Sequence, residues 1–393
     1  MAGNDAPLSG IRVLDLTRYL AGPFCTMLLA DYGADVVKVE SPGGREFRIP
    51  GMKSDSYFFL SSNRGKRSLT LDVRAPAGRE LLLRLLPHFD VLVENFRPAV
   101  SERLGLGPEM LTERFSRLIY CGISGFGADG PYRDRPGFDQ IAQGMSGLMS
   151  LTGTEETGPT RAGIAISDLL AGIFAAHGIQ LALLARQRSG RGQVVNTSLL
   201  EATVAILSWG AGMYFESGTT PGPAGHHHPL SSPYGRFRAR DGYINIAAGN
   251  PAMWEKLARE LGRTDWLDDE RFANPFSRLQ HRAELSAAIE GELEKEDVDH
   301  WVDRLNEVGV PTGPVLDMAQ VFSNPQVIAR AMKIELPHPE VGTFKTTGLP
   351  VKLSRNPGSI DRPPLYGEHT DDVLLESGLT RDEIARLRQD QIV

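Results

Sequence analysis

The chain has 393 residues, which is enough to bury two hydrophobic cores, and 41% of them are hydrophobic while 23% are charged. Its formal net charge of −7 excludes nucleic acid and anionic membranes as main partners, because both require a positive surface. The two cysteines, Cys25 and Cys121, lie in apolar runs and the first ten residues carry no targeting pattern, so we expect a cytoplasmic protein.

Short apolar strands alternate with helices over the first 123 residues. The strands are predicted from apolar runs and the helices from their start and stop residues. Such alternation indicates an α/β fold, with a parallel sheet covered by helices on both faces. The predicted strands cover 12–16, 35–40, 68–72, 91–93 and 118–123, and the predicted helices cover 23–32 and 76–86.

A long apolar helix is predicted after Asp168. Its apolar run, 169–185, is interrupted by His177 and Gln180 and is shorter than the roughly 20 residues that span a bilayer. We therefore expect a buried helix and no membrane partner. A strand at 193–197 and a helix at 199–216 follow.

A segment rich in Gly, Pro and His, 218–229, indicates a linker between two domains. After it, two strands flank the turn Asp241-Gly242, the strongest hairpin signal in the chain. Helices then continue to about residue 322. The predicted organisation is a large domain at 1–217, a linker at 218–232, a small α+β domain at 233–330, and a segment at 331–393 that returns to the large domain.

Asp168 stands directly before the long apolar helix. A carboxylate at a helix N-terminus accepts hydrogen bonds from free backbone N–H groups and lies at the positive end of the helix dipole, so we expect it to stay ionised. An ionised carboxylate beside an acyl carbonyl can attack it and form an anhydride. A plain helix cap is the commoner role of such an aspartate, and position alone favours it.

Four cations surround one predicted strand in this acidic protein: Arg64, Lys66, Arg67 and Arg74. Arginine and lysine beside exposed amides are typical of sites that hold the phosphates of coenzyme A (CoA), although a solvated basic edge has the same composition. Asn95 and Phe96 follow the end of a strand, where open α/β sheets bind ligands. Phe96 either faces an adenine ring there or belongs to the core.

Three common site types are absent from the sequence or weakly indicated. The first strand is not followed by Gly-x-Gly-x-x-Gly, so a nicotinamide dinucleotide bound in the usual way is not expected. Adjacent histidines at 226–228 cannot easily surround a metal ion, and no further ligand motif accompanies them. No Gly-x-Ser-x-Gly is present for a serine hydrolase.

A series of motifs, in order along nearly the whole chain, resembles the class III CoA-transferases, the family of formyl-CoA transferase and the carnitine and bile-acid CoA-transferases. The motifs are LDLTR at 14–18, AGP at 21–23, GADVVKVE at 33–40, NRGKRSLTLD at 63–72, VENFRP at 93–98, SGFG at 124–127, GFD at 137–139, GVP at 309–311 with GP at 313–314, and GEHT at 367–370. Asp168 falls between the seventh and the eighth.

The resemblance implies an enzyme in which Asp168 is the nucleophile and CoA is a co-substrate, with no metal or permanently bound cofactor. It implies a Rossmann-like large domain, a smaller domain, and a homodimer of two interlocked chains. A loop at 225–229 would cover the reacting centre, bringing Gly225 and His228 near the substrate, although His226 stands where asparagine is expected. The implied CoA contacts are Ala21, Leu71, Arg74, Asn95, Phe96, Arg103 and Leu104.

Two other functions remain open at this point. An α-methylacyl-CoA racemase resembles the same fold but needs a second base, typically a histidine where this chain has Phe138. A non-catalytic acyl-CoA-binding protein would not require Asp168. The overall likeness favours transfer between succinyl-CoA and a dicarboxylate, whose second carboxylate Arg18, Arg45 or Arg48 could hold, unless these are surface charges.

Overall fold

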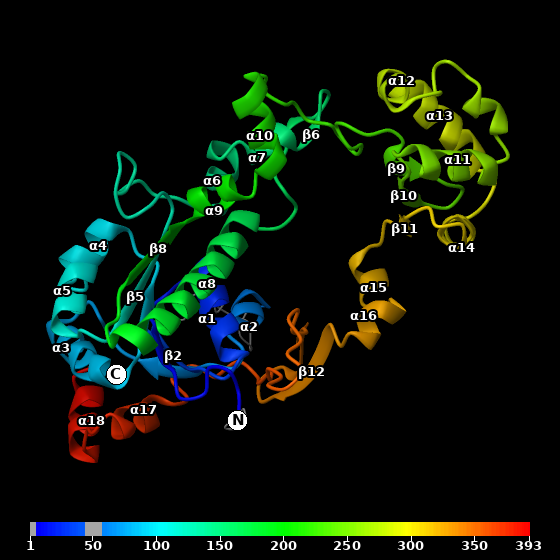
Figure 1. The fold of residues 1–393 in the computed structure, drawn as a ribbon. Coiled ribbons are helices and arrows are strands. Elements are labelled where there is room, and N and C mark those ends of the chain that lie inside the picture. The colour runs from blue at the N-terminus through cyan, green and yellow to red at the C-terminus, as the bar shows by residue number, and fades with distance from the viewer. Residues whose placement is uncertain (1–4, 44–56) are drawn as a thin grey trace. The chain divides into compact units, whose positions relative to one another are not determined.

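A computed structural model describes residues 5–43 and 57–393 (Figure 1). The chain divides into two compact units. The first contains the described residues up to 149 together with 161–220 and 328–393, and the second contains 150–160 and 221–327. Residues 150–160, which the sequence analysis kept in the large domain, therefore belong with the second unit.

Six parallel strands form the central sheet of the first unit, in the order β3-β2-β1-β4-β5-β8. This confirms the predicted α/β fold with a parallel sheet. The order reverses between β1 and β4, the point at which open α/β sheets form a crevice for ligands at the carboxyl ends of their strands. The strands are β1 (Arg12–Asp15), β2 (Asp35–Glu40), β3 (Arg67–Thr70), β4 (Val91–Glu94), β5 (Ile119–Ser124) and β8 (Val194–Ser198).

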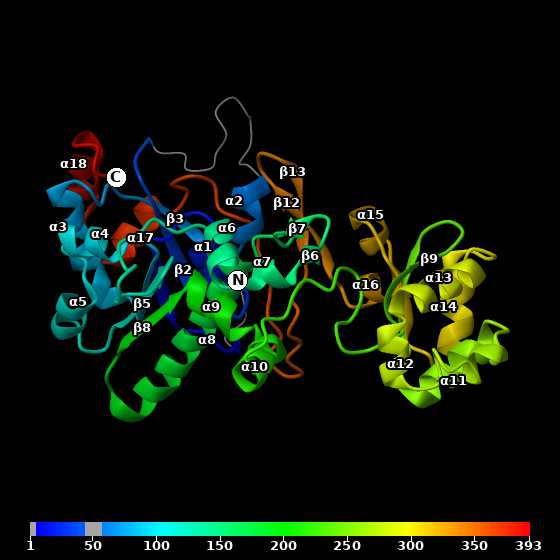
Figure 2. The same cartoon turned by 90° about the horizontal axis from the view of Figure 1, so that it is seen from above.

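Side chains of the strands point alternately into two hydrophobic cores, as a pleated sheet requires. Val13 and Val36 pack on one face beneath α1 and α8, while Leu14 and Val37 pack on the other face beneath α3, α17 and α18 (Figures 1 and 2). The helices of this unit are α1 (Ala21–Ala30), α2 (Tyr57–Ser62), α3 (Pro76–Leu85), α4 (Pro98–Arg103), α5 (Pro108–Arg114), α6 (Asp139–Met145), α8 (Ile166–Ser189), α9 (Leu199–Ala205), α10 (Ser208–Ser217), α17 (Thr370–Glu376) and α18 (Arg381–Gln389).

The last 66 described residues, 328–393, return to the sheet of the first unit. The backbone N–H of His369 donates to the carbonyl of Ser68 at 2.9 Å, and that of Thr70 donates to Thr370 Oγ1 at 3.0 Å. Arg64 donates to Thr346 Oγ1 at 2.9 Å, which ties a hairpin of β12 (Lys333–His338) and β13 (Gly342–Thr347) to the same unit. The sequence analysis did not predict this hairpin.

Helix α8 is apolar on both sides, which corrects the expectation of a wholly buried helix. By length and composition alone it could cross a membrane. One side packs on α1, where a Cβ at Gly172 would lie 2.7 Å from the carbonyl of Ala21. The opposite side exposes large apolar side chains, namely Ile173, Phe174, Leu181 and Leu184.

The second unit has its own core between a small sheet and a group of helices. β9 (Tyr234–Arg238) and β10 (Tyr243–Ala247) form the predicted hairpin, and β11 (Thr312–Pro314) pairs with β10. Trp254 and Trp266 stack in the core with ring centroids 6.0 Å apart. The main helices of this unit are α11 (Pro251–Glu260), α12 (Pro275–Gln280), α13 (Arg282–Leu293), α14 (Val298–Glu307) and α15 (Met318–Val321).

Candidate active site

Asn95 joins the loops after β1 and β4 at the crevice of the sheet. Its side chain follows β4 and binds both backbone groups of Arg18, which follows β1: Arg18 N–H donates to Asn95 Oδ1 at 2.8 Å, and Asn95 Nδ2 donates to the Arg18 carbonyl at 2.7 Å. The next residue, Tyr19, has a φ of 66°, a left-handed conformation that costs a bulky residue free energy. Asn95 therefore holds a strained turn at the carboxyl end of the sheet.

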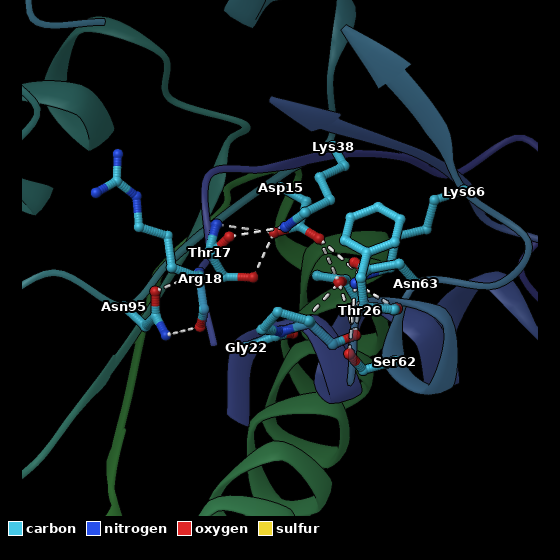
Figure 3. A network of polar contacts seen from close by, with 12 residues as sticks. Asp15, Thr17, Arg18, Gly22, Thr26, Lys38, Ser62, Asn63, Lys66 and Asn95 are labelled. Atoms are coloured by element: carbon cyan, nitrogen blue, oxygen red, sulfur yellow. Dashed lines mark hydrogen bonds and ion pairs between the residues drawn. The ribbon is translucent and has the colours of Figure 1, made fainter. Parts of the chain in front are cut away.

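A buried charge network also supports this turn (Figure 3). Asp15, at the end of β1, accepts hydrogen bonds from the hydroxyls of Thr17 and Thr26 and pairs with Lys66 at 3.0 Å, and both charged side chains are fully buried. Lys38 Nζ donates to the carbonyl of Thr17 at 2.8 Å. Burial alone would raise the pKa of Asp15, but Lys38, Lys66 and the two hydroxyls hold it below its usual range.

This network overturns most of the predicted phosphate site at 64–74. Lys66 pairs with Asp15, Arg64 forms a buried pair with Asp31 at 2.7 Å, and Arg67 pairs with Asp35 and Glu376. Burial lowers the pKa of Lys66 to about 8 despite its partner. Three of the four cations thus stabilise the fold, and in the described residues Arg74 alone of the four is exposed without an ion pair.

Asp168 lies in the wall of an open cavity of about 370 Å³ in the first unit. The cavity opens at the carboxyl ends of β1, β4 and β5, and two loops meet in its wall so closely that a Cβ at Gly125 would lie 2.8 Å from Gly137 Cα. It is lined by Tyr19, Ala21, Asn95, Arg97, Ile123, Ser124, Gly125, Pro136, Gly137, Phe138, Asp168 and Leu199.

The environment of Asp168 differs from that of a helix cap. It is the third residue of α8, and among the described residues its carboxylate accepts no hydrogen bond. Burial, with a smaller effect from the carboxylate of Asp139, raises the pKa of Asp168 to about 7. Asp168 therefore does not cap the helix, and its site disfavours the ionised form that the sequence analysis expected.

The comparisons with known proteins agree over nearly the full length. The model of CoA-transferase family III matches residues 8–370. The chain belongs to this family. It is 38% identical to the succinate–glutarate CoA-transferase of Agrobacterium fabrum, covering 96% of this chain and 97% of the relative, and 38% identical to the succinyl-CoA:glutarate CoA-transferase of Mus musculus, covering 94% and 86%.

A solved structure of a related protein supports the same family assignment. A CAIB/BAIF family protein from Brucella suis superposes with a TM-score of 0.86 at 38% identity, covering 95% of this chain and all of that one. The chain is thus a CoA-transferase that moves CoA between an acyl-CoA and a carboxylic acid, which confirms the predicted enzyme class and the expected co-substrate. It also excludes the alternative of a non-catalytic binding protein.

The other residues predicted for the transferase site lie in several places. Ala21 and Asn95 line the cavity of Asp168, whereas Arg18, Leu71 and Phe96 line a smaller neighbouring cavity of about 40 Å³. Tyr19 lines both. Arg74, Arg103 and Leu104 lie outside both cavities, Gly225 and His228 belong to the second unit, and Arg45 and Arg48 lie outside the described residues.

The predicted substrate loop is fixed within the second unit. Arg282 donates to the carbonyls of His228 and Pro229 at 2.9 and 3.0 Å, and the N–H of Gly225 donates to the carbonyl of Gly153 at 2.9 Å. Burial and neighbouring cations lower the pKa of His227 to about 4, so this ring is neutral at physiological pH. Among residues 5–43 and 57–393, no group of three potential ligands is placed to hold a metal ion.

Two residues of the cavity, Tyr19 and Arg97, were missed from the sequence, and Phe138 was considered only as the position of a racemase base. Tyr19 and Phe138 are exposed, and their rings meet edge to face with centroids 5.7 Å apart. Arg97 is exposed and carries the positive charge of the cavity wall in the described residues. The side chain of Phe138 has no group that can carry a proton. The motif VENFRP contained Arg97, but only its neighbours Asn95 and Phe96 were singled out.

Proposed function

We propose that this transferase moves CoA from succinyl-CoA to a dicarboxylic acid through covalent intermediates on Asp168. The observation that carries the proposal is the free carboxylate of Asp168 in the wall of an open cavity. Its raised pKa makes the ionised form a stronger nucleophile than an ordinary aspartate. The relatives named as succinyl-CoA:dicarboxylate transferases support the choice of substrates.

The proposed chemistry needs no other reactant. The Asp168 carboxylate attacks the thioester carbonyl, the C–S bond breaks, and an aspartyl anhydride and CoA thiolate form. The thiolate then attacks the aspartyl carbonyl and releases the donor acid, leaving an aspartyl-CoA thioester. The acceptor carboxylate repeats both steps in reverse order, so that it leaves as the new thioester and Asp168 regains its carboxylate.

We further propose that CoA extends from this cavity along the carboxyl ends of β1, β3 and β4. Ala21, Leu71, Asn95 and Phe96 would form its apolar and backbone contacts. Arg74, with Arg103 and Leu104 at the end of α4, would hold the adenine and phosphate end, because Arg74 and Arg103 are exposed and have no ion pair in the described residues. Asn95 would act mainly through the backbone of Arg18, since both of its polar groups bind there.

Arg97 is our candidate for the second carboxylate of the substrates. A dicarboxylate bound with one end at Asp168 presents its other end to the surrounding wall, where a guanidinium can bind it in a bidentate manner. Arg97 lies in that wall, whereas Arg18 lines the neighbouring cavity with its guanidinium 5.7 Å from the ring of Phe96.

We also propose the interlocked homodimer that the resemblance implies. The outer side of α8 exposes Ile173, Phe174, Leu181 and Leu184, and α10 exposes Phe215 by 81%. Exposed large apolar side chains of this kind are typical of an interface between protein chains. A second copy of the chain would bury it.

A screen of donors and acceptors tests the proposed substrates. Succinyl-CoA and acetyl-CoA are each incubated with glutarate, succinate or butyrate, and the new thioester is measured by mass spectrometry. We expect the fastest transfer from succinyl-CoA to a dicarboxylate. Equal rates with butyrate would contradict the role of a second carboxylate.

A further inference from the structure

The N-terminus of α8 is capped from another helix. The first backbone N–H groups of a helix have no partner inside it, and Ala165 before α8 offers no side-chain oxygen. Asp139, the first residue of α6, supplies one instead: its Oδ1 accepts from the N–H of Ser167 at 2.9 Å and from that of Asp168 at 3.5 Å. The backbone of the proposed nucleophile is therefore held by a carboxylate 29 residues earlier.

A buried glutamine holds that carboxylate in turn. Gln143 is fully buried, and its Nε2 donates to Asp139 Oδ2 at 2.7 Å. Gln143 Oε1 accepts from the N–H of Ala162 at 2.9 Å, so the same side chain also holds the segment that leads into α8. From α9, Thr203 donates to Ser167 Oγ at 2.8 Å. Asp139 is thus fixed on both of its oxygens and cannot move away from Asp168 without breaking this set.

The negative charge of Asp139 also acts on the carboxylate of Asp168. Helices α6, α9 and α1 pack on α8 and carry the titratable side chains of Asp139, Glu201 and Cys25 respectively. Tyr19 and Arg97 line the cavity with Asp168. Asp139 is the one that hydrogen-bonds to the backbone of Asp168 and contributes, after burial, to its raised pKa. A like charge nearby disfavours the ionised form and makes it more basic.

We propose that Asp139 is a positioning residue for CoA transfer, which fixes the backbone of Asp168 and, through its negative charge, sets the pH range in which Asp168 attacks. The proposal rests on Asp168 being the nucleophile. It assigns to Asp139 a role beyond folding, because a capping residue without charge would serve the helix equally well.

The test compares three variants with succinyl-CoA as the probe. The rate at which Asp168 is acylated is measured between pH 5 and pH 9 by rapid quench and mass spectrometry. Asp139→Asn keeps an oxygen for the cap but removes the charge, so the acidic limb of the profile is expected to move down by about one pH unit. Asp139→Glu keeps the charge but displaces the cap. The acidic limb is therefore expected to stay at the same pH, while the acylation rate on the plateau falls. Asp129→Asn, an exposed aspartate, is the matched control and leaves the profile unchanged.

The outcomes separate this proposal from the one on which it rests. If wild-type protein forms no adduct at any pH, Asp168 is not the nucleophile and both proposals fall. An adduct that forms with the same acidic limb in wild type and in folded Asp139→Asn overturns the role of Asp139 alone. If Asp139→Asn does not fold, Asp139→Glu provides the test. This variant keeps the negative charge, so an acidic limb that moves to lower pH while the plateau rate falls overturns the role of Asp139.

Discussion

The side chain of Asn95 binds the backbone N–H and the backbone carbonyl of one residue, Arg18, at 2.8 and 2.7 Å. These two hydrogen bonds join the loops after β1 and β4, the strands at which the order of the sheet reverses. The next residue, Tyr19, has a left-handed backbone and lines both cavities. The geometry of this turn therefore depends on the carboxamide of Asn95 in addition to the buried network around Asp15.

Asn95→Ala removes both hydrogen bonds and leaves the backbone of Arg18 without these partners. We expect the free energy of unfolding to fall by about 1–3 kcal/mol, the cost of unpaired groups in a partly buried turn. The KM for acyl-CoA should rise more than kcat falls, because the cavity wall is displaced while Asp168 is not. Urea unfolding and steady-state kinetics measure the two effects, and an unchanged KM would show that the turn does not shape the CoA site.

Asp168→Asn should stabilise the protein at alkaline pH. The pKa of Asp168 is raised on folding to about 7, so the folded state binds its proton more tightly than the unfolded state does. The stabilisation is complete below the unfolded pKa near 4 and is lost as the pH rises through about 7. Asparagine stays neutral, and we expect it to raise the free energy of unfolding at pH 8 by about 1–3 kcal/mol relative to wild type.

Urea unfolding of both proteins at pH 5 and pH 8 checks this expectation. The advantage of Asp168→Asn should be smaller at pH 5, where wild-type Asp168 is protonated. Asp129→Asn serves as the control for a change of net charge at an exposed position. A variant that loses stability equally at both pH values would mean that the ionised carboxylate is not destabilised by its site.

The main strands and their alternation could be predicted because local residue patterns determine them. Val13 and Leu14 point into opposite cores, and a run of apolar residues is the expected sequence of such a strand. The helix at 199–216 was predicted as one but is two, α9 and α10, since Ser208 takes a φ of 44° at the break. Nothing in the local sequence indicates that the helix breaks at Ser208.

The candidate site was only partly predictable because its partners are far apart in the chain. Lys66 looked like a phosphate ligand, but Asp15 lies 51 residues earlier and neutralises it in the core. Asp168 looked like a cap, but the capping group comes from Asp139. The composition of a segment does not reveal which of its charges find buried partners when the sheet assembles.

Arg97→Gln tests the proposed contact with the second carboxylate. A lost charge-assisted pair costs about 1.5–3 kcal/mol, so the KM for glutarate should rise by roughly 10- to 150-fold. The KM for a monocarboxylate should change little. Arg135→Gln is the matched control, because Arg135 stacks on Tyr132 and does not line the cavity. An equal effect on both classes of acceptor would indicate a role in CoA binding instead.

Leu181→Glu combined with Leu184→Glu should weaken the proposed homodimer. Both side chains are more than half exposed on the outer side of α8, and a buried unpaired charge is costly at an apolar interface. Light scattering of the wild type should give about twice the chain mass of 42.9 kDa, and the variant a lower mass. Leu375→Glu on α17 is the control at a second exposed leucine. An active wild-type monomer would refute the dimer.

Covalent labelling of Asp168 tests the central claim most directly. Wild-type protein is incubated with succinyl-CoA, quenched and digested, and the peptide with Asp168 is examined by mass spectrometry with and without hydroxylamine. The account predicts a CoA or succinyl adduct on Asp168 that hydroxylamine converts to a hydroxamate, and transfer reduced by several orders of magnitude in a folded Asp168→Asn variant. An unmodified peptide under turnover, together with rapid exchange of the α-proton of a branched acyl-CoA in deuterated water, would contradict it.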